Sequence, residues 1–212
     1  MRRTAAAAAE TREAVMNAAL EVFAEKGWAA TTLDEVARRA GVTRGAVYHH
    51  GHDKRSLLVS VLKENWRTVM EPAWERLTDR STPPRDRLTG FLAAFLRLLS
   101  EDARFRALVT VTVSVAPQLP TADSDLTDKQ ATIGAWRDDL RSVAAEIGDP
   151  LPSGLRPDDV AYALLTVLYG ATTLASGREL PGAAAGAATP DLAAAIVHGL
   201  TDETNSSPTA VL

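Results

Sequence analysis

The sequence predicts an all-α fold, in which an N-terminal lobe of three helices precedes a larger helical region. Apolar residues recur at spacings of three and four through most of the 212 residues, which is the period of a helix rather than of a strand. Capping residues and glycines divide the first part of the chain into short segments. Because the chain contains no cysteine, its stability must come from an apolar core, and a chain of this length can bury one.

The first helix is predicted from an apolar stripe that stops at a glycine. Gly27 follows the stripe at the position where a left-handed residue ends a helix, and Trp28 can then fold back onto the last turn. The stripe consists of Val15, Ala18, Ala19, Val22 and Phe23. For the alanine tract 5–9 that precedes it, we favour disorder.

Two short helices follow the first one. The segment from Thr32 to Glu35 is a capping box, in which the Thr32 hydroxyl accepts from the Glu35 amide and the Glu35 carboxylate reaches back. This helix has barely two turns before it stops at Gly41. Thr43 then caps a second short helix, Arg44–His49.

Longer helices occupy the rest of the chain. One is predicted from Asp53 to Leu77, and Pro72 should kink it or end its first part. Valines at 109, 111, 113 and 115 alternate with Thr and Ser as in a strand, but a single strand would have no partner, so we expect a buried helix there. Beyond the linker 81–84, helical patterns cover residues 88–100, 128–147, 158–176 and 190–202.

The two short helices and the turn Ala40–Val42 form a helix-turn-helix arrangement. In such a pair the first helix crosses the DNA backbone, and the N-terminal residues of the second enter the major groove. Arg44 then stands where it can bind guanine O6 and N7 or a phosphate. Gly45 weakens its helix by ~1 kcal/mol relative to alanine, which is understandable where a side chain would collide with DNA. The Thr32 and Thr43 hydroxyls lie at helix N-termini, where phosphates bind readily.

The charges are distributed unevenly along the chain. Residues 1–60 contain nine Lys or Arg and seven Asp or Glu, a net charge of +2. The remaining residues contain 14 basic and 20 acidic side chains, a net charge of −6. An acidic protein with a basic N-terminal part can hold a polyanion by that part only, although this asymmetry alone is a weak indication.

The run from Thr31 to His50, TTLDEVARRAGVTRGAVYHH, with Lys54 and Leu57 after it, resembles the DNA-binding domain of TetR-family repressors. The preceding segment Phe23–Trp28 resembles the end of that family's first helix. The resemblance covers residues 10–60, while the helical remainder is similar only in length and layout. Regulators of multidrug efflux are the branch that the chain resembles most.

This resemblance implies the organisation and the partners of the chain. It implies a DNA-binding domain over residues 1–52, a helical ligand-binding and dimerisation domain over residues 53–204, and a flexible tail over residues 205–212. It also implies a homodimer that represses transcription from a palindromic operator in double-stranded DNA, and that a small, apolar effector releases. We expect no catalytic residue, no metal and no other cofactor. No apolar run of 18 residues suggests a membrane span, and the expected location is the cytoplasm.

Three sets of candidate site residues follow. The DNA-binding set is Thr32, Thr43, Arg44, Gly45, Tyr48, His49 and Lys54. The ligand-binding set, which could equally be plain core, is Trp66, Met70, Phe91, Phe95, Val111 and Trp136. The dimerisation set, which could also be core of one protomer, is Leu164, Leu168, Ile196 and Leu200.

One position departs from the family pattern. Where the family usually has Phe after the third helix, this chain has Gly51, followed by His52. A buried Phe would contribute ~3 kcal/mol or more to the small lobe, so we expect the lobe to be less stable or its helix to end earlier, with Trp28 compensating in part. The geometry of Lys54 is the feature that this departure puts in question.

Other functions have less support in the sequence than DNA binding has. His49, His50 and His52 could ligate a metal, but no second cluster of ligands exists, so we interpret them as helix-cap and solvated residues. A small helical enzyme is the main alternative, and no paired-carboxylate, phosphate-loop or nucleophile-elbow motif supports it. A role as a protein-interaction scaffold would not explain the capped helix after Thr43.

Overall fold

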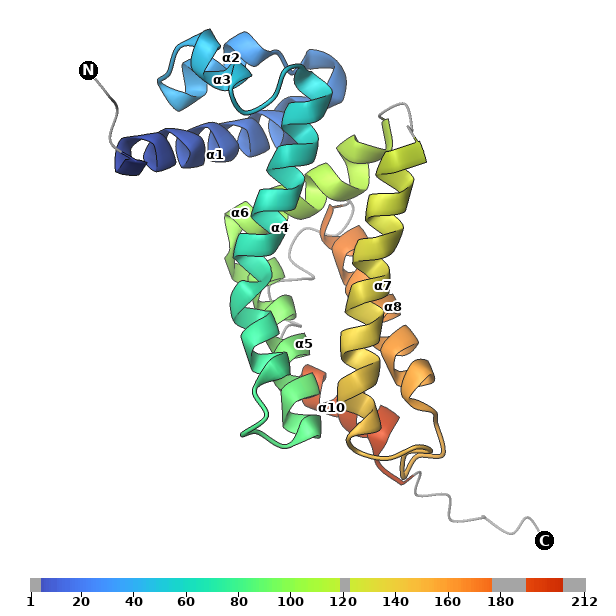
Figure 1. Cartoon of the computed structure of the whole chain (residues 1–212). Helices are drawn as coiled ribbons and strands as arrows, with labels where there is room; N and C mark the ends of the chain where they lie inside the picture. The colour runs from blue at the N-terminus through green and yellow to red at the C-terminus, as the bar shows by residue number, and fades with distance from the viewer. Residues whose placement is uncertain (1–4, 119–122, 177–189, 204–212) are drawn as a thin grey trace, which may run out of the picture. The chain divides into compact units, whose positions relative to one another are not determined.

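The computed structural model describes residues 5–118, 123–176 and 190–203, and in these ranges it contains helices and no strand (Figure 1). Side chains are described for residues 6–118, 133–176 and 190–203. The described chain divides into two compact units. The first comprises residues 5–71, 101–118 and 172–176, and the second comprises residues 72–100, 123–171 and 190–203. The all-α prediction is confirmed for the described residues.

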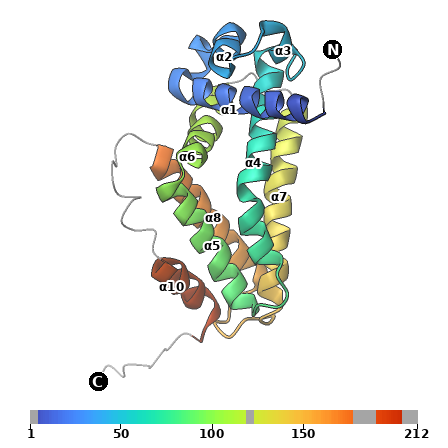
Figure 2. The ribbon, with the colours of Figure 1, turned by 90° about the vertical axis from the view of Figure 1, so that its left-hand side faces the viewer.

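The first unit is built around the N-terminal helices. Figures 1 and 2 show α2 and α3 beside one another against α1, and α1 also contacts α6 and η1. The elements are α1 (Ala5–Ala30), α2 (Leu33–Ala40), α3 (Arg44–Tyr48), the part of α4 (Lys54–Thr78) before Pro72, α6 (Ala103–Thr110), the π-helical turn η1 (Val111–Val115) and the 3₁₀ turn η2 (Ala116–Gln118). The apolar stripe predicted for α1 is buried in full, which confirms the helical period.

The break predicted at Gly27 is present inside α1. Gly27 has φ 71° and ψ −177°, a backbone conformation that glycine adopts without a Cβ penalty. After this break the Trp28 ring stacks on Phe23, with ring centroids 6.1 Å apart and 8° between the planes. At the other end α1 begins at Ala5, so the alanine tract is helical, where we had favoured disorder. Alanine has the highest helix propensity, and the tract continues a helix that packing already stabilises.

The valine-rich stretch after α6 is helical, as predicted, and it contains a π-helical turn. Val109, Val111 and Val115 are buried, whereas Val113 is half-buried and Ser114 is exposed. The expectation of a fully buried segment was therefore wrong for its outer face. In the same unit, buried Asn65 of α4 accepts from Arg104 Nε of α6 at 2.9 Å, which satisfies a polar group inside the core.

The second unit starts within α4, which continues through Pro72 rather than ending there. Its other helices are α5 (Pro84–Glu101), α7 (Asp123–Ala145), α8 (Pro157–Ser176, up to residue 171) and α10 (Pro190–Thr201). Arg87 is only 4% exposed, and it donates to the Leu77 carbonyl at 2.7 Å and to Glu146 at 2.6 Å. These bonds join α4, α5 and the end of α7.

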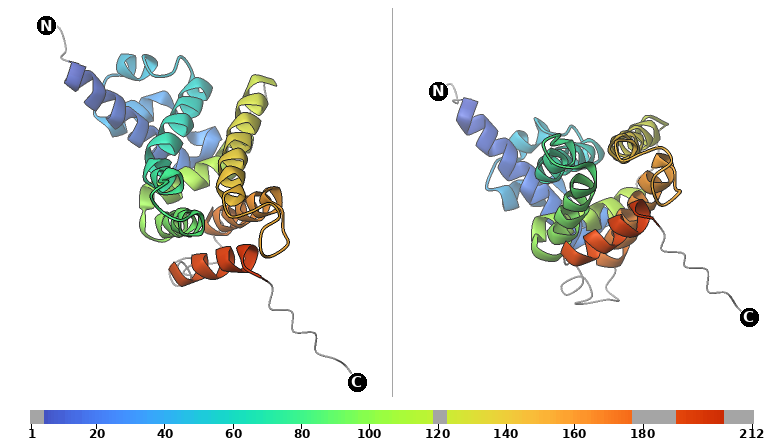
Figure 3. Two further views of the ribbon diagram at one scale, coloured as in Figure 1. Left: turned by 60° about the horizontal axis from the view of Figure 1, so that its bottom comes forward. Right: turned by 90° about the horizontal axis from the view of Figure 1, so that it is seen from below.

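The end of α10, drawn in red in Figure 3, is held by the start of α5. Arg85 donates to the Thr201 hydroxyl at 3.1 Å and lies 3.0 Å from an Asp202 carboxylate oxygen. The Ser153 hydroxyl donates to the Leu200 carbonyl at 2.7 Å. Every helix in the described part of the chain is too short or too polar to span a membrane. The tail predicted for residues 205–212 lies outside the described residues.

Candidate nucleic-acid interface

The first helix of the predicted pair, α2, begins at a capped threonine. The Glu35 amide donates to Thr32 Oγ1 at 3.2 Å, as the capping box requires. The reciprocal half of the box is corrected by the structure, because the Glu35 carboxylate lies between Lys26 Nζ, at 2.9 Å, and Arg38 Nη2, at 2.6 Å. Two cationic donors bind a carboxylate more strongly than one backbone amide does.

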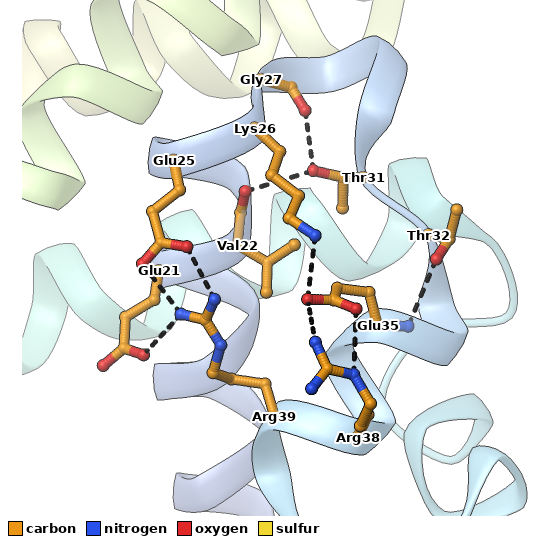
Figure 4. Close-up of polar contacts among 10 residues, drawn as sticks. All are labelled: Glu21, Val22, Glu25, Lys26, Gly27, Thr31, Thr32, Glu35, Arg38 and Arg39. Atoms are coloured by element: carbon orange, nitrogen blue, oxygen red, sulfur yellow. Dashed lines mark hydrogen bonds and ion pairs between the residues drawn. The ribbon is translucent and has the colours of Figure 1, made fainter.

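These charged side chains fasten α2 to α1 (Figure 4). Arg39 of α2 contacts Glu25 at 2.7 Å and Glu21 at 3.3 Å, both on α1. The hydrogen bonds from Arg38 and Lys26 lower the pKa of Glu35 from 4.5 to about 2. Both arginines of α2, Arg38 and Arg39, therefore form specific ion pairs and do more than solvate one face of the helix.

The connection from α1 to α2 is also fixed by a buried threonine. Thr31 is 1% exposed, and its hydroxyl lies 2.7 Å from the Gly27 carbonyl and 3.4 Å from the Val22 carbonyl (Figure 4). A hydroxyl that satisfies carbonyls at a helix end stabilises the bend there. The position of α2 is thus set by its ion pairs with α1 and by this hydroxyl in the connection between the two helices.

The turn between α2 and α3 has the expected glycine geometry. Gly41 has φ 66° and ψ 28°, in the left-handed region. Its amide donates to the Arg38 carbonyl at 3.3 Å, and the Val42 amide donates to the Ala37 carbonyl at 3.0 Å. This pair of bonds is the usual way to end a helix at a glycine, and it confirms the predicted stop.

The short helix α3 has one buried face and one exposed face. Ala46 and Val47 are buried, and the Ala46 amide donates to Thr43 Oγ1 at 3.3 Å, which confirms the cap. The exposed residues are Thr43, Arg44, Gly45, Tyr48 and His49, and Thr32 of α2 is exposed as well. Six of the seven predicted DNA-binding residues therefore lie at the surface of α2 and α3.

Arg44, at the start of α3, is held by two neighbours. Its Nη1 donates to Asp34 Oδ2 of α2 at 3.3 Å, and its Nη2 donates to the Tyr48 hydroxyl at 3.0 Å. Its guanidinium carbon lies 5.5 Å from the centroid of the Tyr48 ring. The hydrogen bond to Tyr48 and the charge of Asp34 raise the pKa of Arg44. Sequence reasoning missed Asp34, since an acidic residue in a first helical turn is ordinary.

Lys54 differs from the other predicted DNA-binding residues. Its ammonium donates to the Trp28 carbonyl at 2.6 Å and lies 4.5 Å from the centroid of the Trp28 ring. Both contacts are favourable for a cation at the end of a helix and over an indole face. Lys54 therefore links the start of α4 to the end of α1.

The histidines after α3 do not assemble a metal site. Within the described residues, no three His, Asp or Glu side chains gather closely enough to hold a metal ion. His50 is half-buried, and burial lowers its pKa, with the charges of Arg12 and His49 adding to this effect. His50 is therefore neutral at neutral pH, whereas His49 and His52 are exposed.

The predicted ligand-binding residues fall into both units. In the first, Trp66 donates from Nε1 to Thr112 Oγ1 at 2.9 Å, and its ring meets Phe105 edge to face at 5.6 Å. Met70 and Val111 are buried in the same unit.

In the second unit the structure brings Phe91 and Trp136 together through Trp74, whose ring centroid lies 4.8 Å from Phe91 and 5.3 Å from Trp136. Phe95, which follows Phe91 on α5, is also buried. Trp74 was not in the predicted set, although it belongs to the same apolar stripe of α4 as Trp66.

The predicted dimerisation residues are divided between core and surface. Leu164 and Leu168 of α8 are 1% and 3% exposed, so the structure places them in the core of the second unit. Ile196 and Leu200 of α10 are half-buried. Burial within one protomer explains the leucine spacing on α8 without a partner.

Comparison with known proteins agrees with this geometry. Residues 15–61 match the family model described as bacterial regulatory proteins, tetR family. The repressor BepR of Brucella suis is 39% identical over 111 residues, which are 52% of this chain and 53% of BepR. The chain spans about half the length of the curated relatives it matches, or less.

Two solved structures share the fold over most of the chain. NalD of Pseudomonas aeruginosa, described as the secondary repressor of the MexAB-OprM multidrug efflux pump, is 27% identical with a TM-score of 0.70, covering 92% of this chain and 97% of NalD. A complex of SmeT with triclosan is 28% identical with a TM-score of 0.63, covering 77% of this chain and 80% of SmeT. SmeT is described as the repressor of the Stenotrophomonas maltophilia multidrug efflux pump SmeDEF.

The fold of the first unit and the exposed edge of α3 define a helix-turn-helix arrangement. Among proteins with this arrangement, the match over residues 15–61 assigns the N-terminal region of the chain to the tetR family of bacterial regulatory proteins.

Proposed function

We propose that this chain is a transcriptional repressor that binds operator DNA through α2 and α3. The observation that carries the proposal is the exposed N-terminal edge of α3, where Thr43, Arg44 and Gly45 stand together above a buried Ala46 and Val47. A helix that offers its N-terminal residues in this way can enter a major groove. Its relatives are named as regulators and its structural neighbours as repressors of efflux pumps, and the enzyme alternative has no such support.

The proposed operator is palindromic, because the proposed repressor is a homodimer. A two-fold dimer places two copies of α3 on half-sites about 34 Å apart. Large apolar side chains on the outer face of α8 support such an assembly: Tyr162 is 73% exposed and Tyr169 is 69% exposed, seven residues further along the helix. Aromatic side chains are enriched in interfaces between proteins. Such a regulator works where the chromosome is, in the cytoplasm.

The proposed effector is a small apolar molecule that releases the repressor from DNA. The aromatic cluster of Trp74, Phe91 and Trp136 in the second unit supports this chemistry, since ligand sites are lined mostly by apolar and aromatic side chains. SmeT, a structural neighbour, has been solved with triclosan, an apolar aromatic compound. Release requires that the effector prefer the form that does not bind DNA, typically by about 1–3 kcal/mol of coupling. A thermal-shift screen of apolar compounds tests this part, because a ligand that binds the folded state raises Tm.

A gel-shift experiment tests DNA binding itself. The full chain is titrated against a duplex from the region upstream of its own gene, with Arg44→Ala as the test variant. Wild-type protein should retard the duplex, and the variant should lose about tenfold or more in affinity, with a salt slope reduced by about 1 if the lost contact is to phosphate. The control is Arg67→Ala on α4, because Arg67 is similarly exposed and also paired with a carboxylate, Glu64.

Two outcomes contradict the proposal. One is that the wild-type chain retards neither the upstream duplex nor any duplex enriched from a random library. The other is that Arg44→Ala and Arg67→Ala bind with equal affinity, which would assign the DNA-binding surface to another part of the chain.

A further inference from the structure

A carboxylate stands on the surface that is proposed to face a polyanion. Asp34 occupies the second position of α2, with its side chain 64% exposed, and its Oδ1 lies 3.2 Å from Arg44 Nε. Its Oδ2 accepts from Arg44 Nη1 at 3.3 Å. The cation expected to contact DNA is thus already paired with an anion of the neighbouring helix.

The contacts of Arg44 involve the same two nitrogens that would bind a base. Guanine offers O6 and N7 as two acceptors, which an arginine binds with two nitrogens of its guanidinium. In this chain Nη1 donates to Asp34 and Nη2 donates to the Tyr48 hydroxyl. Each of these nitrogens carries a second N–H, so an acceptor pair on DNA would share the guanidinium with these two partners or replace them.

The ion pair between Arg44 and Asp34 is weak enough to be replaced by a contact with DNA. The Arg44 and Asp34 side chains are 59% and 64% exposed, and exposed ion pairs are weak and screened by salt. Asp34 also repels any phosphate that approaches Arg44, because like charges at short distance are unfavourable. The edge of a guanine is neutral, so Asp34 opposes a contact between Arg44 and a phosphate more than it opposes a contact between Arg44 and a base.

We infer that Asp34 is a specificity-determining residue, which neutralises Arg44 on non-cognate DNA and yields it to a guanine edge in the operator. This inference rests on the proposed function and assigns a role to a residue of the same surface. Asp34 acts through Arg44, so it is a positioning residue. Its effect is expected in the ratio of specific to non-specific affinity, because the non-specific part comes almost entirely from phosphate contacts.

The experiment measures the affinity of the full chain for two duplexes of equal length. One duplex is selected from a random library by the wild-type protein, and the other has random sequence. Asp34→Asn removes the charge and keeps the size of the side chain. Binding to the random duplex should rise about three- to fivefold, with a salt slope steeper by about 1, and binding to the selected duplex should rise less. The ratio of the two affinities should therefore fall.

Two further variants separate this role from a structural or purely electrostatic one. Glu13→Gln removes one negative charge from an exposed position of α1 and should leave the ratio at its wild-type value. In an Arg44→Ala background, Asp34→Asn should no longer change the ratio, because the residue through which it acts is absent. Unfolding midpoints of all variants should match wild type, since both carboxylates are exposed.

The outcomes distinguish the two proposals. If Asp34→Asn changes the ratio no more than Glu13→Gln does, or changes it equally with and without Arg44, the role of Asp34 is overturned while DNA binding stands. If the wild-type protein enriches no duplex from the library, the proposed function is overturned, and the role of Asp34 with it.

Discussion

Gly45 is the residue whose identity the protein's own interior does not explain. A Cβ built there would meet only Thr43 Oγ1, at 3.9 Å, and its φ is not in the left-handed region. Neither steric crowding nor backbone strain therefore requires glycine. What remains is the space outside the protein, where the proposed groove of DNA would lie.

Gly45→Ala should thus separate stability from binding. Alanine is the better helix former, so the free energy of unfolding should rise by up to about 1 kcal/mol. Affinity for the selected duplex should fall, because the added methyl group occupies space next to the bases. Urea unfolding and gel shift of the same preparation measure both quantities. Unchanged DNA affinity would show that α3 does not approach DNA at this position.

The second prediction at the scale of one residue concerns Glu35 and the pH dependence of the free energy of unfolding. Hydrogen bonds from Arg38 and Lys26 lower its pKa to about 2 in the folded protein, below the ordinary 4.5. The unfolded state therefore takes up the proton first, so the stabilisation by ionised Glu35 is complete above pH 4.5 and is lost as the pH falls from 4.5 to 2.

Glu35→Gln removes this titration. The difference in unfolding free energy between wild type and variant should be constant above the ordinary pKa and should shrink at lower pH. Urea titrations followed by circular dichroism at several pH values measure it, with Glu13→Gln as the control. A difference that stays constant through this range would mean that the ion pairs of Glu35 in Figure 4 do not form in solution.

At the scale of elements, the junction of α3 and α4 depends on Gly51. This residue is buried, and a Cβ there would lie 2.6 Å from the Cα and the amide nitrogen of Leu57 on α4. Where TetR-like sequences usually have Phe, α4 of this chain passes too close for any side chain. Trp28 stacks on Phe23 and lies under Lys54, and we expect these contacts to counter part of the weakness of the lobe.

Gly51→Ala should therefore destabilise the protein, although no left-handed backbone conformation requires glycine at this position. Backbone atoms cannot move aside cheaply, so the expected loss is about 1–3 kcal/mol in the free energy of unfolding. Gly134→Ala on α7 is the matched control: its Cβ would meet nothing within 4 Å, so it should stabilise by up to about 1 kcal/mol. Equal effects of the two substitutions would argue against the close approach of α4.

At the scale of the whole molecule, the proposed repressor requires a second copy of the chain. The burial of Leu164 and Leu168 leaves three large apolar side chains of α8 exposed, which are Tyr162, Tyr169 and Leu174. Tyr162 and Tyr169 lie seven residues apart and so share one face of the helix, and an exposed apolar patch of this kind is typical of a surface that another protein covers.

Replacing both Tyr162 and Tyr169 by Arg should convert the dimer to a monomer, because two like-charged pairs would face each other across a two-fold axis. Sedimentation velocity measures the change, and affinity for a palindromic duplex should fall with it. Ile133→Arg on α7 is the control, since Ile133 is also exposed, at 48%, and should leave the assembly intact. A wild-type chain that sediments as a monomer at micromolar concentration would contradict the proposed dimer.

Much of this molecule could be predicted from local patterns. The caps at Thr32 and Thr43 and the stop at Gly41 form within a few residues, so the sequence is enough to place them. The break at Gly27 and the return of Trp28 to Phe23 follow from the same short-range geometry. The valine-rich segment alternates like a strand, so its local pattern alone was not enough. Its helix could be predicted only because a single strand would have had no partner.

The sequence by itself determined the order of the helices and the edge of α3 that is exposed, because helical periodicity and capping act between residues at most a few positions apart. Only the tertiary structure decided which charges meet: Asp34 with Arg44, Glu35 with Lys26, and Lys54 with the end of α1. It also decided that Gly51 has no room for a side chain and that two leucines of α8 belong to the core. These facts depend on how separate segments of the chain come together, and no local period of the sequence carries that information.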